Sequence, residues 1–181
     1  MERMVQRVND LNWDNPSLAD LTFAAVLAQN GLLTRLNKEL FLRDRSLTTV
    51  TTPHLTSLIA CVAHYVHIYN ISDCLDTILD SVNCEQLSIS RQILSSDETK
   101  ALVQAMESRL ERVRLGIGIY GNGNVTIDID VLTKYSGRGK CKTLVCDEDL
   151  MARYNKEIRT WATRKGWRIF KFLGNNVELH R

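Results

Sequence analysis

Hydrophobic positions along this chain recur in a six-residue pattern: apolar, two other residues, apolar, one other residue, apolar. The clearest copy runs from Leu110 to Leu115, with Val113 as its middle apolar residue. Because Val113 and Leu115 are two residues apart, they share one face of a β-strand, and Arg112 and Arg114 share the other. Seven copies occur, with Asn37 as the one polar residue in their apolar columns: Val8-x-x-Leu11-x-Trp13, Asn37-x-x-Leu40-x-Leu42, Ala63-x-x-Val66-x-Ile68, Cys84-x-x-Leu87-x-Ile89, Leu110-x-x-Val113-x-Leu115, Cys141-x-x-Leu144-x-Cys146 and Trp167-x-x-Phe170-x-Phe172.

The intervals between these copies have room for helices. Apolar residues recur there at spacings of three and four, which is typical of a helix with one buried face. Helices are expected from about Ser17 to Ala28, from Pro53 to Val62, after Asp73, after Ser95-Ser96-Asp97-Glu98, from Asp128 to Tyr135 and from Glu148 to Lys165. A strand followed by a helix that returns to the next strand makes the strands parallel.

The regular alternation predicts one α/β domain over residues 1–181. The middle apolar residues fall at positions 11, 40, 66, 87, 113, 144 and 170, so consecutive copies are 21 to 31 residues apart. Self-similarity at such a period favours a stacked repeat fold. The sequence therefore predicts a solenoid of about seven strand–helix units, with a strand core near each of these positions.

The columns resemble leucine-rich repeats of the ribonuclease-inhibitor-like type, as in the carboxy-terminal region of NOD-like receptors. The copy at Leu110–Leu115 and the stretch from Ser95 to Glu107 before it carry the resemblance, which covers residues 8 to 173. It implies a horseshoe arc with a parallel sheet on the concave face and helices on the convex face. It also implies a non-enzymatic protein-binding scaffold, with an innate-immune or signalling role in the cytosol.

The repeats are degenerate at the position three residues beyond the last apolar one. The family usually has Asn or Cys there, and its side chain bonds a neighbouring turn. In this chain only Asn175 fits that preference, because the positions hold Pro16, Arg45, Ile71, Gln92, Gly118, Asp149 and Asn175.

Residues that alternate with the core columns are expected on the concave face, where they form a candidate partner-binding site. Tyr, Phe and Arg are enriched in the cores of protein–protein interfaces because they combine a large contact area with directional polar groups. The proposed contact residues are Phe41, Arg43, Tyr65, His67, Tyr69, Arg112 and Arg114.

Charge suggests a different use of the chain. The overall net charge is only +2, but residues 151–181 contain eight Lys or Arg and two Asp or Glu. A basic end of this kind favours nucleic-acid binding as an alternative function. The basic patch would comprise Arg153, Lys156, Arg159, Arg164, Lys165, Arg168 and Lys171. A third alternative is a truncated piece of a longer solenoid without independent function, since no polar cap precedes the first strand.

The sequence offers little for catalysis, metal binding or membrane insertion. No signal peptide or apolar run long enough for a membrane span is apparent, so we expect a cytoplasmic protein. Five cysteines in apolar positions indicate reduced thiols, and Cys141 and Cys146 lack a partner pair for zinc. Gly116-x-Gly118-x-x-Gly121 does not open a helix, as a dinucleotide-binding fingerprint requires, and indicates a flexible insertion instead. We therefore expect no enzyme activity, no cofactor and no metal.

Overall fold

The structure is a computed structural model that describes residue 8 and residues 17–43, 52–71, 74–118, 121–171 and 176–181. The helices of this described part are α2 (Leu18–Gln29), α4 (Thr52–Cys61), α5 (Leu75–Ser81), α6 (Ser96–Ser108), α7 (Ile129–Leu132) and α8 (Glu148–Arg164). Its longer strands are β1 (Glu39–Arg43), β2 (Tyr65–Tyr69), β3 (Gln86–Ser90), β5 (Arg112–Leu115), β9 (Thr143–Cys146), β10 (Arg168–Lys171) and β11 (Val177–His180). Short strands are β4 (Gln92–Ile93), β6 (Ile117–Gly118), β7 (Gly121–Asn122) and β8 (Val125–Thr126).

A central sheet organises the chain. Its order in the described residues is β1-β2-β3-β5-β9-β11-β10, and the first five strands run parallel to one another. The middle apolar residues of five sequence copies pair strand by strand in one row, and each is fully buried: Leu40, Val66, Leu87, Val113 and Leu144. The prediction that these five side chains form one neighbouring row is confirmed.

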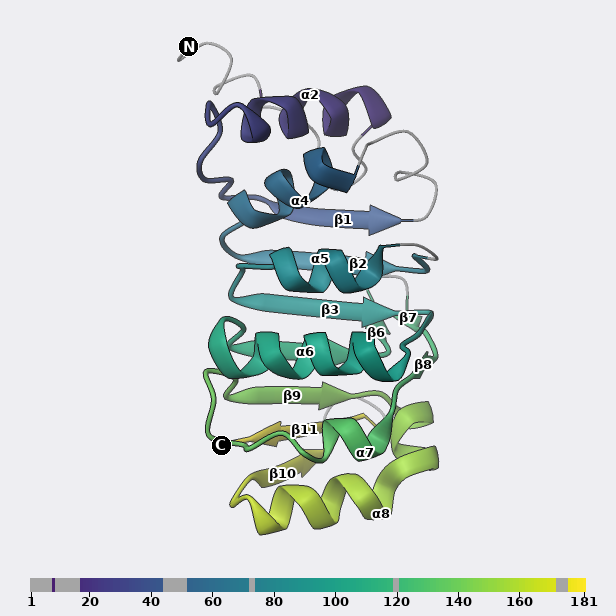
Figure 1. Cartoon of the computed structure of the whole chain (residues 1–181). Helices are drawn as coiled ribbons and strands as arrows, with labels where there is room; N and C mark the ends of the chain where they lie inside the picture. The colour runs from purple at the N-terminus through teal and green to yellow at the C-terminus, as the bar shows by residue number, and fades with distance from the viewer. Residues whose placement is uncertain (1–7, 9–16, 44–51, 72–73, 119–120, 172–175) are drawn as a thin grey trace.

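The helices lie on one side of this sheet (Figure 1). In that view α4, α5, α6 and α7 lie in front of the strands, with α2 beyond α4 at one end and α8 beside β10 at the other. Their apolar stripes pack against the core row and form one continuous hydrophobic core. The opposite side of the sheet, which faces away from these helices, is called the open face below.

Local sequence explains where the helices begin. Ser95 accepts a hydrogen bond from the Glu98 backbone N–H, and the Glu98 carboxylate accepts one from the Ser95 N–H at 2.7 Å. This capping box satisfies two backbone donors that the first turn of α6 leaves unpaired. Asp128 caps α7 and Asp147 caps α8 in a similar way, each through a side-chain oxygen.

The expected leucine-rich-repeat solenoid of about seven strand–helix units is wrong as a description of the fold. The structure is a mixed α/β arrangement in which β11 runs antiparallel to both β9 and β10. The chain leaves β9 through α8, places β10 at the edge, and then turns back to insert β11 between β9 and β10. The alternating pattern of a strand is the same in either chain direction, so the pattern alone did not reveal this reversal. The expected strand near residue 11 lies outside the described residues.

The last sequence copy also differs in which residue faces the core. Phe170 was expected in the core row, but its side chain is 48% exposed, and its neighbour Ile169 packs against the core instead. The register pairs Ile169 with Leu179, which continues the buried row through Leu144. Phe170 therefore lies on the open face near the edge of the sheet.

The glycine-rich stretch after β5 forms a short antiparallel hairpin. β6 pairs with β7 through Ile117 and Asn122, and the Ser88 hydroxyl on β3 donates to the Ile117 carbonyl. Because Ser88 lies on the open face, this bond holds β6 against that face, and Figure 1 shows β6 and β7 near the carboxyl end of β3. The sequence indicated a flexible insertion here and did not predict the hairpin.

Candidate functional site

The open face brings together all seven residues that the sequence predicted for partner binding. Phe41, His67 and Arg114 belong to one row across the strands, and Tyr65 and Arg112 belong to the next. Their neighbours along each strand are the buried core residues, which point to the helices. Alternation along β1, β2 and β5 therefore places Phe41, Arg43, Tyr65, His67, Tyr69, Arg112 and Arg114 on the open face.

Four aromatic rings on β1 and β2 form a packed group, called the aromatic cluster. The ring centroids of Phe41 and His67 are 5.7 Å apart, and those of Phe41 and Tyr65 are 6.0 Å apart, both edge-to-face. Tyr69 packs edge-to-face on His67 at 6.4 Å. These separations and angles are the favourable arrangement for aromatic pairs, so the cluster is held together by its own contacts.

The members of the aromatic cluster differ in how much of them solvent reaches. Phe41 is 5% exposed and His67 is 2% exposed, whereas Tyr65 and Tyr69 are half-buried. The sequence placed all four rings at a binding surface. The structure shows Phe41 and His67 as the floor of the cluster and leaves Tyr65 and Tyr69 as its accessible part.

His67 is a buried, hydrogen-bonded histidine on the open face. Its Nε2 lies 2.8 Å from the Ser90 hydroxyl, which is itself buried. Burial and, to a smaller extent, the positive charge of Arg43 together lower the pKa of His67 to about 4. The imidazole is therefore uncharged at neutral pH and packs as an aromatic ring.

We expect His67 to make folding less favourable in mild acid. The unfolded chain binds a proton at this histidine below about pH 6.5, but the folded chain does so only near pH 4, so stability falls as pH drops between these values. The loss should reach about 1–2 kcal/mol at about pH 5. Urea unfolding of the wild type and of His67→Gln, at neutral pH and at about pH 5, measures this loss of stability, because glutamine does not titrate. Equal pH dependence in the two proteins would contradict this assignment.

The two predicted arginines on β5 have different surroundings. Arg112 Nη2 lies 2.7 Å from Glu178 Oε1, and His180 Nε2 lies 3.2 Å from the same oxygen. Glu178 is 9% exposed, so the Arg112–Glu178 pair is largely shielded from water. Arg114 takes part in none of the ion pairs between described residues, and its Nε, like that of Arg112, is enclosed without a hydrogen-bond partner.

Several residues of this face were missed by the sequence analysis. Glu178 and His180 come from β11, 66 or more residues beyond Arg112, so no local pattern connects them. Away from this face, on β4, the Gln92 side chain accepts from the Ile71 N–H at 2.9 Å and donates to the Ile71 carbonyl at 2.6 Å. Gln92 thus bonds a neighbouring turn, a role that the sequence assigned only to Asn or Cys. Asn175, which fitted that preference, lies outside the described residues.

The basic residues proposed for nucleic-acid binding do not gather on one surface. Arg153 donates to the Thr126 hydroxyl at 2.8 Å and to the Val125 carbonyl, and so joins α8 to β8. Arg164 and Lys165 line a hollow beside Asp130 on α7, and Arg168 lies on the open face. Lys156 projects from the exposed side of α8.

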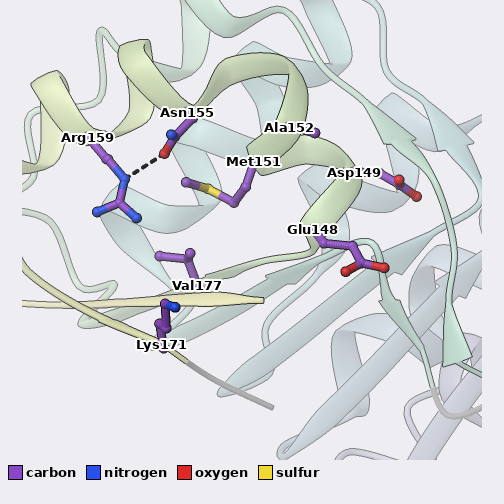
Figure 2. Close-up of a pocket in the computed structure, with 8 residues that line it drawn as sticks. All are labelled: Glu148, Asp149, Met151, Ala152, Asn155, Arg159, Lys171 and Val177. Atoms are coloured by element: carbon purple, nitrogen blue, oxygen red, sulfur yellow. Dashed lines mark hydrogen bonds between the residues drawn. The ribbon is translucent and has the colours of Figure 1, made fainter. Parts of the chain in front are cut away.

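Arg159 and Lys171 line a groove between α8 and the end of the sheet (Figure 2). Met151 and Val177 form its apolar floor, and Arg159 Nε donates to Asn155 Oδ1 at 2.5 Å. Glu148 and Asp149 lie at the other end of the same groove. The groove therefore carries both signs of charge, which does not favour a site for a polyanion.

The described residues show no arrangement typical of a reactive thiol or a metal site. Burial raises the pKa of Cys84 to about 12 and that of Cys141 to about 11, and it also raises the pKa of Cys146. Such thiols stay protonated and unreactive at neutral pH. Within the described ranges, no three His, Cys, Asp or Glu side chains are grouped as metal ligands.

Nothing in the described part of the chain resembles a membrane-spanning helix in both length and apolar character. Comparisons with protein families, with curated proteins and with solved structures found no match for this chain.

Proposed function

We propose that this chain is a non-enzymatic protein-binding module that contacts its partner through the open face of the sheet. The observation that carries the proposal is the aromatic cluster, in which half-buried Tyr65 and Tyr69 rest on buried Phe41 and His67. The helices pack on the other side of the sheet, so this cluster is not part of the helix-packed core.

The cluster is well suited to binding because its geometry is already fixed. Tyr65 and Tyr69 each contact another ring of the cluster, and the Arg91 guanidinium lies 5.5 Å from the Tyr69 ring centroid. A partner that covers such side chains immobilises few additional rotamers, which reduces the entropic cost of association. Tyrosine and arginine are also the residue types that most often dominate the energy of protein interfaces.

We place this activity in the cytosol. The described cysteines are all free thiols, and three of them are buried in the core. Free buried thiols are typical of proteins in reducing compartments. The pathway, including the signalling role that the resemblance implies, stays a prediction.

The double variant Tyr65→Ala with Tyr69→Ala tests the proposal. We expect it to lose the proteins that co-purify with the tagged wild type from cells, because it removes the accessible part of the aromatic cluster. Quantitative mass spectrometry of the two purifications measures the loss. Circular dichroism and the thermal midpoint show whether the variant remains folded.

Phe170→Ala provides the matched control. Phe170 is an exposed aromatic residue on the same face but at the β10 edge, so its removal deletes an aromatic ring away from the cluster. The control should retain the co-purifying proteins. A second variant, Tyr69→Lys, retains more of the packing than the double variant. If Tyr69→Lys and the folded double variant both keep the same co-purifying proteins as the control, the proposal is wrong.

A further inference from the structure

Arg114 is a cation on the open face for which the described residues supply no anion. Its neighbour Arg112, two residues earlier on β5, pairs with Glu178 at 2.7 Å. Arg114 has no such pair, its Nε is enclosed without a hydrogen bond, and its side chain as a whole is half-buried. A half-buried guanidinium has lost part of its hydration without a compensating charge, and an anionic partner group would supply it.

The surroundings of Arg114 favour an anion. In the register Arg114 lies between Ser88 on β3 and Val145 on β9, neither of which is charged. The carboxylate of Glu178, across Val145, is already bonded by Arg112 and His180. Binding an anion at Arg114 therefore requires no existing ion pair to break.

Arg114 also adjoins the aromatic cluster. Burial raises the pKa of the Tyr65 phenol, and the Ser88 side chain and the positive charge of Arg114 both act in the opposite direction. Arg43 acts on His67 from the other side of the cluster, and Arg91 lies over the Tyr69 ring. The accessible tyrosines are thus bordered by three arginines and one carboxylate, that of Glu39 beside Tyr65, so this part of the open face carries a net positive charge.

We propose that the partner is an acidic protein segment, in which an Asp or Glu carboxylate pairs with Arg114 while neighbouring side chains contact Tyr65 and Tyr69. This inference rests on the proposed function, which it deepens by naming the chemistry of the partner. A guanidinium and a carboxylate form short, charge-assisted hydrogen bonds in a fixed geometry. The pair therefore fixes the register of the segment, and the tyrosines supply apolar contact area.

A displayed library of random peptides of roughly twelve residues, selected on immobilised wild-type protein, tests the proposal. We expect the selected peptides to share an Asp or Glu at one position, with aromatic or aliphatic residues nearby. Synthetic peptides from the selection should bind Arg114→Gln at least about tenfold more weakly than the wild type. Replacing the shared acidic residue by Asn or Gln in the peptide should cause a similar loss.

Arg168→Gln is the matched control, because Arg168 is an exposed arginine on the same face but at the β10 edge. It removes the same charge and should leave peptide affinity within about twofold of the wild type. A second selection, on Arg114→Glu, should enrich Lys or Arg at the position where the wild type selects an acid. This reversal does not depend on how much affinity any single substitution removes.

The outcomes separate this inference from the proposed function. Peptides that lose binding to the Tyr65→Ala, Tyr69→Ala variant but bind Arg114→Gln as well as the wild type would overturn the acidic partner alone. Selected peptides that bind both of these variants normally would overturn the use of the open face as well. A selection that yields no binders to the folded wild type would count against both proposals.

Discussion

Gly116→Ala is expected to destabilise the protein by roughly 3–5 kcal/mol, a large part of the stability of a domain this size. Gly116 follows β5 with a φ of +80°, a conformation that costs an L-residue about 1–2 kcal/mol. A Cβ at this position would lie 2.0 Å from Asp147 Oδ2 and 2.2 Å from Asp147 Cγ. Asp147 is fully buried, and its Oδ1 accepts from the Leu150 N–H at 2.8 Å, so moving it removes the cap of α8. Urea unfolding measures the change.

Gly31→Ala separates the two contributions. Gly31 also has a positive φ, +68°, but a Cβ there meets no atom within 4 Å. This control should cost only about 1 kcal/mol, the backbone part of the effect. If Gly116→Ala costs no more than Gly31→Ala, the contact with Asp147 does not contribute.

A double variant tests the contact itself. Serine is also a favourable capping residue and has a shorter side chain than aspartate. Gly116→Ala should therefore destabilise an Asp147→Ser background less than it destabilises the wild type, by about 1–2 kcal/mol. Additive effects would contradict the steric explanation.

The sequence predicted the parallel part of the sheet because each strand there carries its own apolar pattern. Leu87 and Val113 are fully buried and adjacent, and helices lie between the strands where the spacing predicted them. Helix ends were also readable in part, since Asp128 and the acidic residues near position 148 mark the starts of α7 and α8. These features depend on short stretches of chain, in which local propensity and the core agree.

The sequence failed where the outcome depends on distant segments. None of the seven copies of the apolar pattern covers β11, which enters the sheet between β9 and β10 and reverses the local chain direction. The seven-unit solenoid was wrong for this reason. A strand with an apolar residue at every second position can pack against the core in either chain direction, so nothing in the pattern distinguished the parallel topology from the mixed one.

The candidate site was predicted as a set of residues but not as a surface. Alternation placed Phe41 and His67 on the open face, but it does not indicate how far a side chain is shielded from solvent. Both side chains are buried on that face by their neighbours. The difference between Arg112 and Arg114 was also hidden, because Glu178 pairs with Arg112 and not with Arg114, and it comes from β11, which lies outside the seven copies of the pattern. Charge pairing across strands requires the sheet order, which a single sequence does not show.

Trp161→Ala is expected to be the other strongly destabilising substitution, by roughly 3–5 kcal/mol. Trp161 on α8 is 1% exposed and packs between Tyr135, 6.0 Å away, and Trp167, 5.4 Å away, as ring-centroid distances. Its indole N–H also donates to the Tyr135 carbonyl at 3.0 Å. Alanine would leave a cavity among the aromatic rings and a buried carbonyl without its donor. Thermal and urea unfolding measure the loss.

Trp161→Phe distinguishes the packing of the ring from its hydrogen bond. Phenylalanine retains much of the aromatic volume but cannot donate to the Tyr135 carbonyl, so this variant should lose about 1–2 kcal/mol, clearly less than alanine. The same truncation at the exposed Phe170, Phe170→Ala, should change stability by less than about 0.5 kcal/mol. If Trp161→Phe is as destabilising as Trp161→Ala, the hydrogen bond to the Tyr135 carbonyl is what holds α8 in place. If both are mild, α8 does not depend on this cluster for its position against the sheet.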